Sequence, residues 1–452
     1  MNDVTLKQRG YTGTEVLALA FGAMIGWGWV VLSGTWIENA GTMGSLLAFV
    51  VGGVLVIFIG MIYGELTSMN PQNGGTAHFV DQAFGATWSK VTSWTLALAY
   101  VSVIAFEAIA FSSVLTHLFG TGIQWGYLYT LGGTEVFLSE ILISMLGTLL
   151  ILWVNGKGET VIGKFQTFVT ILILIAGVAL VFANTQVPLN SEAIIEVKSG
   201  FKGFMAVFIM TPFMFMGFDV IPQISGSSNV PLKKMGAMVS VSVTLAALWY
   251  MAIIFSVGNI LASDHLTQGI AAADALAYAF NNNLILGKIM ILAGIGGIIS
   301  SWNAFMTGGT AVISPLLQRD SISKKKASKN ALTILGLVSL LSPCLGKAYM
   351  TSFINAGSFA MILVYGVVVL SYVVIKRKAP EIYRPYKVPM WPIVVICSTL
   401  TIIGTAIASM PGSPVALTAF EWLIISIWMV CGYFVLKPVM KNRSSLETRI
   451  VN

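Results

Sequence analysis

Charged side chains are scarce in this sequence. Asp, Glu, Lys and Arg together make up 10% of its 452 residues, against about 25% in soluble globular domains. Hydrophobic residues make up 56%, and the mean hydropathy is +0.85. Apolar runs of about 20 residues, the length that crosses the hydrocarbon core of a bilayer, recur along the chain. The shortage of charge therefore excludes an ordinary soluble fold and predicts an all-α polytopic protein embedded in a lipid bilayer.

Cysteine and histidine are also rare, with three residues of each. The cysteines, Cys344, Cys397 and Cys431, are odd in number and far apart, which argues against a disulfide framework or a metal site. The histidines lack the spacing of metal ligands. A glycine–lysine phosphate loop and a nucleophile motif are missing as well. We therefore expect no enzyme activity, no ATP-driven step and no cofactor other than a coupling ion, Na+ or H+.

Twelve apolar stretches are long enough to be membrane spans. Polar joints rich in Gly, Asn and Lys separate them. The polar segment 1–10 and the length of the first apolar run predict that no signal peptide is cleaved. The expected limits of the spans are 12–38, 41–69, 86–118, 133–154, 160–184, 203–228, 233–262, 284–316, 328–345, 347–376, 388–409 and 414–437.

The basic residues fall unevenly on the two sides that twelve spans create. The side that holds both termini carries all but four of the 25 Lys and Arg residues; the other keeps only Lys198, Lys202, Lys288 and Lys347. Cytoplasmic loops of membrane proteins are enriched in Lys and Arg. We therefore predict a multi-pass protein of the cell membrane with both termini in the cytoplasm. On this interpretation the net charge of +7 reflects topology and indicates no nucleic acid partner.

Glycines interrupt the first apolar run between Phe21 and Gly34, at positions 22, 26, 28 and 34. Glycine inside a helix costs up to about 1 kcal/mol relative to alanine and lets the backbone leave helical geometry. Within a membrane, an unwound backbone persists only where protein buries it or where it lines a cavity. The pattern predicts a binding site made of main-chain groups. The alternative is that the small residues let two helices pack closely.

A second interruption is expected in the sixth span between Thr211 and Pro222, where Gly217 follows Pro212. Proline removes a backbone donor and disturbs the preceding turn. Interrupted segments at corresponding places in two halves indicate a transporter with inverted repeats. The expected organisation is a cytoplasmic N-terminus at 1–11, a first repeat at 12–184, a second repeat at 203–376, two peripheral spans at 388–437 and a cytoplasmic C-terminus at 438–452.

Four motifs resemble those of the amino acid–polyamine–organocation (APC) superfamily, which includes the amino acid permeases. They are Gly22–Gly28, Tyr63–Leu66 with Pro71–Thr76 and Ala83–Gly85, Met216–Asp219, and Arg384–Pro389. The resemblance implies the leucine-transporter-type fold, in which spans 1–5 and 6–10 are inverted repeats and spans 11 and 12 are peripheral. It also implies a secondary transporter that imports an amino acid by alternating access. A channel or a receptor is the less favoured class.

The resemblance also implies where a substrate binds. Its carboxylate is expected at the backbone N–H groups of Gly26, Trp27 and Gly28, because helix N-termini favour anions. Its amine is expected at carbonyl groups of both interruptions, namely those of Met24, Ile25, Phe213, Phe215 and Met216. The expected lining also includes Phe218, beside the second interruption, and Asn303, in the eighth span.

Departures from the superfamily leave the coupling ion open. Many members carry a lysine in the fifth span, seven residues after a glutamine, and this position is Ile173 here. Ser300 and Ser301, together with the carbonyls of Gly22 and Ile25, form a candidate sodium cage, since hard cations prefer oxygen ligands. The alternative is that both serines donate hydrogen bonds within their own helix.

Two acidic residues are candidates for function. Glu107 lies in the third span, where an ionised carboxylate costs several kcal/mol unless it is paired or hydrated. It is expected to meet a cationic substrate group, to carry a coupled proton, or to form a structural hydrogen bond; the first role favours a cationic amine such as a polyamine or an amino alcohol. Asp219 directly follows the second interruption, where it either caps the next half-helix or contacts the substrate. The sequence indicates neither the exact substrate nor a partner protein.

Overall fold

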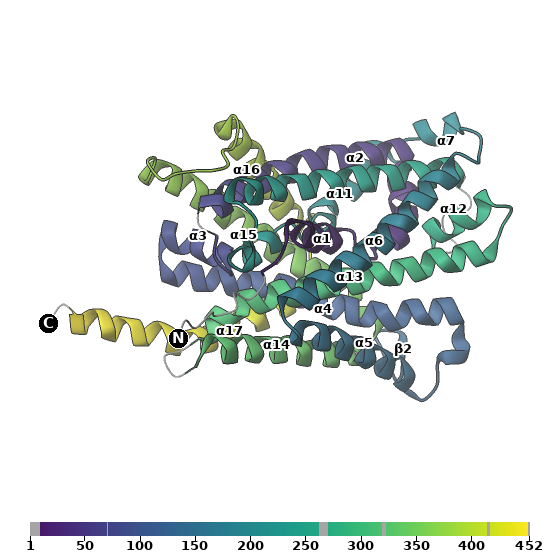
Figure 1. Ribbon diagram of the computed structural model, residues 1–452. Coiled ribbons are helices and arrows are strands. Elements are labelled where there is room, and N and C mark those ends of the chain that lie inside the picture. The colour runs from purple at the N-terminus through teal and green to yellow at the C-terminus, as the bar shows by residue number, and fades with distance from the viewer. Residues whose placement is uncertain (1–9, 70, 262–269, 319–321, 414–415, 451–452) are drawn as a thin grey trace, which may run out of the picture.

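The structure is a computed structural model that describes residues 10–69, 71–261, 270–318, 322–413 and 416–450, with side chains up to residue 436 (Figure 1). Residues 1–9 of the expected N-terminal segment 1–11, and the side chains of the expected C-terminal segment 438–452, lie outside this range. The described chain is mainly helical, as the composition predicts, because a helix satisfies its own backbone hydrogen bonds where no water can do so.

Ten helical segments in the described part of the chain are long and apolar enough to cross a membrane. Each combines 18 or more residues with high hydropathy, and together they make the chain a polytopic membrane protein. Their helices are α2 (Gly28–Met69), α4 (Ala86–Phe119), α5 (Leu138–Gly156), α6 (Glu159–Asn184), α11 (Leu232–Ile260), α13 (Leu284–Leu317), α14 (Lys324–Leu341), α15 (Met350–Lys378), α16 (Trp391–Ala408) and α17 (Ala419–Ile450).

Shorter helices complete the described chain. Two short apolar segments, Gly13–Met24 and Gly200–Met214, lie where the sequence predicts the first and sixth spans to begin. The α-helices are α1 (Gly13–Met24), α3 (Gly75–Phe84), α7 (Ser191–Ile195), α8 (Gly200–Phe208), α9 (Thr211–Met214), α10 (Val220–Ile224) and α12 (Ala271–Ala279), and the 3-10 turns are Thr121–Ile123, Ser225–Ser227, Ser342–Leu345 and Lys347–Tyr349.

Helix α2 bends sharply at Gly41. Its 42 residues correspond to about 63 Å of helix, roughly twice the thickness of the hydrocarbon core. Gly41 has φ 72° and ψ 170°, and a side chain there would collide with the backbone of Glu196. The bend falls at the first residue of the expected span 41–69, close to the expected boundary with the span 12–38.

The beginning of the expected fourth span, 133–154, was wrong. Residues Thr134–Phe137 form strand β2, which pairs antiparallel with β1 (Tyr127–Leu131), and α5 begins only at Leu138. Gly132 and Gly133 both have positive φ and form the turn of this hairpin. β-branched and aromatic residues on either side of a two-glycine turn favour a hairpin over a helix.

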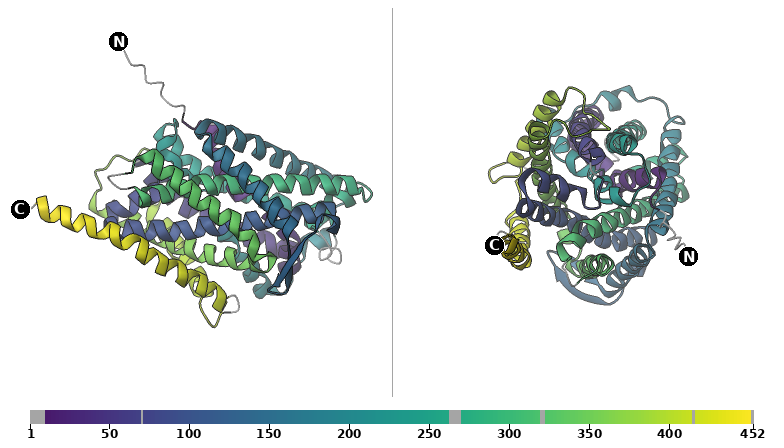
Figure 2. Two further views of the ribbon diagram at one scale, coloured as in Figure 1. Left: turned by 90° about the horizontal axis from the view of Figure 1, so that it is seen from below. Right: turned by 60° about the vertical axis from the view of Figure 1, so that its left-hand side comes forward.

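Helix α1 lies near the middle of the bundle (Figure 1) and packs against α6, α11 and α13. The hairpin, α7 and α12 lie at one end of the molecule, and α3 lies at the opposite end. Helix α17 lies on the periphery (Figure 2), where it contacts α15 and α4. The interruption at the end of α1 is therefore enclosed by long helices on several sides.

Candidate functional site

The first interruption leaves backbone donors unused. Helix α1 ends at Met24, α2 begins at Gly28, and Ile25–Trp27 are not helical. The N–H of Ile25 still donates to Phe21 O, at 3.0 Å. Among the described residues, no hydrogen bond takes the N–H groups of Gly26, Trp27 or Gly28. Unpaired N–H groups in the interior are rare and costly, so this turn has the donors that an anionic ligand needs.

The second interruption satisfies its own backbone. Helix α9 ends at Met214 and α10 begins at Val220, with Gly217 at φ 135° between them. The N–H of Gly217 donates to Asp219 Oδ1, at 2.9 Å, and the hydroxyl of Tyr100 on α4 donates to Asp219 Oδ2. The prediction that Asp219 caps the following half-helix is wrong, because its carboxylate makes no bond to the first turn of α10. Asp219 instead holds the interruption itself in place.

The two interruptions touch each other. A Cβ built on Gly217 would lie 2.6 Å from Ala23 Cβ and 2.9 Å from Met24 N, so only glycine allows this approach. A Cβ built on Gly28 would lie 3.3 Å from Met214 Sδ. The residues that the sequence analysis assigned to one substrate site from two distant segments are thus brought together.

Glu107 lies beside the first interruption. Its side chain is 3% exposed, and its Oε1 would lie 3.3 Å from a Cβ built on Gly26. Ser301 of α13 interacts with its carboxyl group, whereas Glu107 Oε2 has no hydrogen-bond partner in the described part of the chain. A buried acidic oxygen that the protein leaves without a partner is typical of functional positions within membranes.

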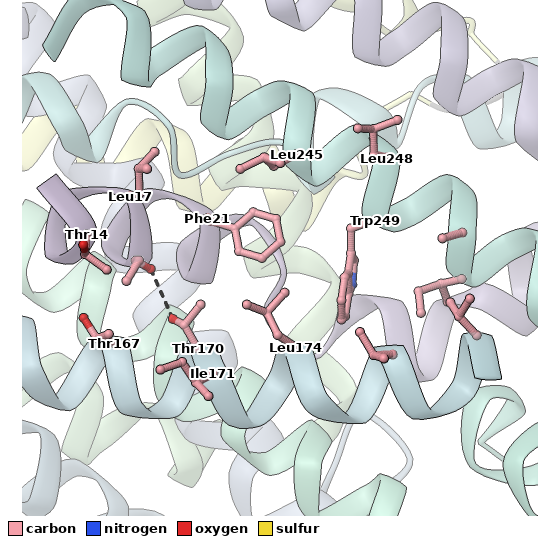
Figure 3. A pocket seen from close by; sticks show the side chains of 16 residues that line it. Thr14, Leu17, Phe21, Thr167, Thr170, Ile171, Leu174, Leu245, Leu248 and Trp249 are labelled. Atoms are coloured by element: carbon pink, nitrogen blue, oxygen red, sulfur yellow. Dashed lines mark hydrogen bonds between the residues drawn. The ribbon is translucent and has the colours of Figure 1, made fainter. Parts of the chain in front are cut away.

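The two serines of α13 have different neighbours. Ser300 Oγ accepts a hydrogen bond from Gln166 Nε2 of α6, at 2.6 Å. Gly22 packs directly against the side chains of Ser300 and Gln166. Gln166 Nε2 also donates to Ala18 O, at 3.1 Å, and Thr170 donates to the same carbonyl, as the dashed line in Figure 3 shows. The neighbourhood of Gly22 and Ser300 is therefore rich in oxygen atoms, but a neutral amide already donates to it.

Asn303 takes part in a buried amide network. Its Nδ2 donates to Gln166 Oε1, at 2.8 Å, and its Oδ1 accepts from Asn155 Nδ2, at 2.9 Å. The network links α13 to α5 and α6. Both ends of the amide are engaged, so substrate contact by Asn303 stays a prediction that requires these bonds to open.

The candidate aromatic residues point in different directions. The ring of Trp27 packs against α13 at Gly294, where a Cβ would clash with it. Phe215 is fully buried against rings of α2 and α11, and Phe218 stacks on Tyr365 with the ring centroids 5.5 Å apart. Phe213 is partly buried. Their side chains shape the walls around the two interruptions.

The groove drawn in Figure 3 is a separate feature. It has a volume of about 550 Å³ and lies between α1, α6 and α11, with Phe21 and Trp249 projecting into it. Its rim carries exposed apolar side chains, among them Val178 at 62% and Leu248 at 55% exposure. An apolar, outward-facing rim is typical of a surface in contact with lipid, so the groove is not the polar site at the interruptions.

The segment before α1 is tied to the segment after α10. Tyr11 N donates to Ser227 O, at 2.9 Å, and Asn229 N donates to Tyr11 O, at 3.0 Å. Burial raises the pKa of the Tyr11 hydroxyl well above its ordinary value. These bonds fasten the two half-helices α1 and α10 to each other at the end of the bundle where α3 lies.

Sequence reasoning missed Tyr250 of α11, whose hydroxyl lies 2.5 Å from Met24 O and 3.1 Å from Met214 O. It also used Gln166, the glutamine seven residues before Ile173, only to locate the position where many superfamily members carry a lysine. In both cases a signal was present, because the large majority of buried hydroxyl and amide groups are hydrogen-bonded. What the sequence could not indicate is which carbonyl each group contacts.

These features define a polytopic helical membrane protein with two adjacent helix interruptions at its centre. The model of the amino acid permease family matches residues 15–448, and the chain belongs to that family. The chain is 22% identical to a methylthioribose transporter of Bacillus subtilis, over 97% of this chain and 95% of the relative. It is 23% identical to a lysine-specific permease of Lactococcus lactis, over 93% and 86% of the two chains. It is 25% identical to the human large neutral amino acids transporter small subunit 2, over 82% and 71%.

This is a family of transporters. The match confirms the resemblance that the sequence motifs indicated. These relatives are named as transporters of lysine, a cationic amino acid, and of large neutral amino acids. At 22–25% identity these names describe the relatives and not the ligand of this chain.

Proposed function

We propose that this protein is a secondary active transporter that moves an amino acid across the cell membrane by alternating access. The observation that carries the proposal is the turn at Gly26, Trp27 and Gly28, whose three backbone N–H groups, before and at the N-terminus of α2, have no hydrogen-bond partner among the described residues. Such a terminus favours a carboxylate. The adjacent carbonyl ends of α1 and α9 favour the amine of the same molecule, because carbonyl groups at a helix C-terminus have no partner within the helix and can accept hydrogen bonds from ammonium.

The wider architecture of the proposal is a twelve-span fold with two inverted five-span repeats and both termini in the cytoplasm. Spans 1, 2, 6 and 7 move against spans 3, 4, 8 and 9. The direct contact between Gly217 and Ala23 supports joint movement of the two interrupted spans. The hydrogen bonds of Tyr11 with residues 227 and 229 support closure of one end of the bundle while the other opens.

Glu107 supports a second candidate substrate, a cationic amine. Its Oε1 lies next to Gly26, and Oε2 of the same carboxyl group has no partner among the described residues, so an ionised Glu107 repels a carboxylate at this turn and attracts an amine. A substrate carboxylate therefore requires Glu107 to be protonated, which makes Glu107 a candidate carrier of a coupled H+. A cationic substrate without a carboxylate has no such requirement.

Sodium is the alternative coupling ion. The proposed cage consists of Ser300, Ser301 and the carbonyls of Gly22 and Ile25, and it is supported by the packing of Gly22 against Ser300. A sodium ion there has to displace the amide of Gln166 from Ser300 Oγ. Ser300→Ala removes one oxygen ligand, so we expect sodium-stimulated uptake to fall at least tenfold. Uptake that is indifferent to sodium in both proteins rejects the cage.

Uptake into liposomes tests the function. Purified protein is reconstituted and offered labelled amino acids and amines, with a sodium gradient or a pH gradient imposed separately. We expect saturable accumulation or exchange of at least one amino acid, dependent on one of the two gradients. A cationic amine as the sole substrate favours the second candidate, and no saturable uptake over the whole panel rejects a transporter of either kind.

A further inference from the structure

Tyr250 lies at the meeting point of the two interruptions. It belongs to α11, the seventh expected span, and only 1% of its surface is exposed. Its hydroxyl is 2.5 Å from the carbonyl oxygen of Met24, the last residue of α1, and 3.1 Å from that of Met214, the last residue of α9. One side chain thus reaches the C-terminal ends of both interrupted half-helices.

Both carbonyl groups need a partner. The last carbonyls of a helix have no partner within it, and each helix C-terminus carries a partial negative charge. Two such ends that meet in a buried place repel each other unless a donor lies between them. In the described part of the chain, no other hydrogen bond to Met24 O or Met214 O is present, so the Tyr250 hydroxyl is that donor.

The ring of Tyr250 is held independently of its hydroxyl. It packs against Trp36 and Phe49 of α2 and against Phe215 beside the second interruption, with ring centroids 5.0–5.8 Å apart. Such aromatic contacts fix the ring through packing. The hydroxyl is therefore aimed at the carbonyl pair by a rigid cluster drawn from four expected spans.

We propose that Tyr250 is a positioning residue for the substrate, whose hydroxyl holds the carbonyl ends of α1 and α9 together so that both face one amine. This inference rests on the proposed function, because it assigns a role within the same binding site. A phenol has one proton and bonds one of the two carbonyls at a time. An ammonium group has three donors and each carbonyl oxygen has two lone pairs, so the amine can bond both carbonyls while the hydroxyl stays in place.

Preorganisation gives the expected sign of the effect. Without the hydroxyl, the two half-helix ends separate, and substrate binding has to bring them back together. Tyr250→Phe keeps the ring cluster and removes only the donor. The matched control is Tyr365→Phe, since Tyr365 is equally buried and its hydroxyl has no hydrogen-bond partner among the described residues.

The test is uptake of the transported amino acid by reconstituted wild-type, Tyr250→Phe and Tyr365→Phe proteins. We expect the KM of Tyr250→Phe to rise about five- to tenfold, the range that losing one buried hydrogen bond gives. Its kcat should stay within about twofold, and the control should keep both values. An unchanged or lowered KM in Tyr250→Phe overturns the inference, as does an equal rise in the control.

Two further measurements keep the inference separate from the proposed function. If the wild type transports no amino acid or amine, the function fails, and amide hydrogen exchange decides the inference: segments 21–28 and 214–219 should exchange faster in Tyr250→Phe than in wild type and control, and equal rates overturn it. If Tyr250→Phe does not fold, a fluorinated tyrosine at position 250, a stronger donor of similar shape, should lower KM; an unchanged KM then overturns the inference.

Discussion

Glu65, near the C-terminal end of α2, and Glu107, in α4, are both buried glutamates on apolar helices, with 0% and 3% of their surfaces exposed. Three groups donate hydrogen bonds to Glu65: Lys376 Nζ at 2.6 Å, the Tyr372 hydroxyl at 3.0 Å and the Val388 N–H at 2.7 Å. Arg384 adds an ion pair, with its Nε 3.0 Å from Glu65 Oε1. Glu107 interacts with Ser301, and its second oxygen has no partner among the described residues.

From this difference we infer a structural role for Glu65 and propose a functional role for Glu107. The partners of Glu65 come from α15 and from the segment before α16, so the ion pairs join α2 to these elements. Within the described part of the chain, Glu107 pairs with no charged group, and it lies beside the N–H groups that have no partner in the first interruption. The fold gives Glu65 several partners and leaves one oxygen of Glu107 without a partner among the described residues. We therefore expect Glu107 to take part in transport.

The largest expected effect on stability is that of Glu65→Gln. The substitution leaves Lys376 and Arg384 without their anion, and breaking a buried ion pair in this way costs about 3–5 kcal/mol. Thermal unfolding of the purified protein in detergent measures the loss. The matched control is Glu196→Gln, at the more exposed Glu196–Lys198 pair, where a change of at most about 1 kcal/mol is expected. Equal effects in the two variants refute the structural role of Glu65.

Asp219→Asn should have a smaller effect on stability. Asparagine can still accept the N–H of Gly217, but it cannot accept from Gly217 and Tyr100 with two carboxylate oxygens as Asp219 does. Loss of one buried partner costs about 1–3 kcal/mol. Unfolding of Asp219→Asn, Tyr100→Phe and the double variant measures this; we expect non-additive losses, as is usual for residues in one network. If the losses of stability in the two single variants add up to that of the double variant, the interaction between Asp219 and Tyr100 is contradicted.

Glu107→Gln should have the smallest effect on stability and a large effect on transport. Because no charged partner of Glu107 is present in the described chain and glutamine can still interact with Ser301, the free energy of unfolding should change by about 1 kcal/mol or less. Uptake should fall at least tenfold or lose its dependence on the pH gradient. A loss of stability comparable with that of Glu65→Gln, or full transport, removes the distinction between the two glutamates.

The sequence predicted what periodicity and composition control. The class of protein, most span limits and both interruptions follow from apolar length, from the glycines at 22, 26 and 28, and from Pro212 with Gly217. The hairpin at 127–137 was missed, because its second strand is continuous in sequence with the apolar run of the fourth span and cannot be distinguished from the start of that span by hydropathy. Contacts between distant segments, such as Tyr250 with Met24 O or Asp219 with Tyr100, depend on the packing of helices that sequence spacing does not fix.

The same limit explains the error at Asp219. An aspartate before a helix is a common N-cap, and nothing in the local sequence shows that Tyr100, 119 residues earlier, supplies a competing donor. Tyr250 illustrates the opposite case. A hydroxyl in an apolar span indicates that a hydrogen-bond partner is present, but only the structure shows which group that partner is.

We propose that an amino acid binds with its carboxylate at Gly26, Trp27 and Gly28. Substrate competition is the most direct test of this binding mode. Wild-type protein in liposomes takes up a labelled amino acid in the presence of the same unlabelled amino acid or of its decarboxylated amine. We expect the amine to compete at least tenfold more weakly than the amino acid, since it lacks the carboxylate that these N–H groups bind. An amine that competes as well as the amino acid contradicts the account.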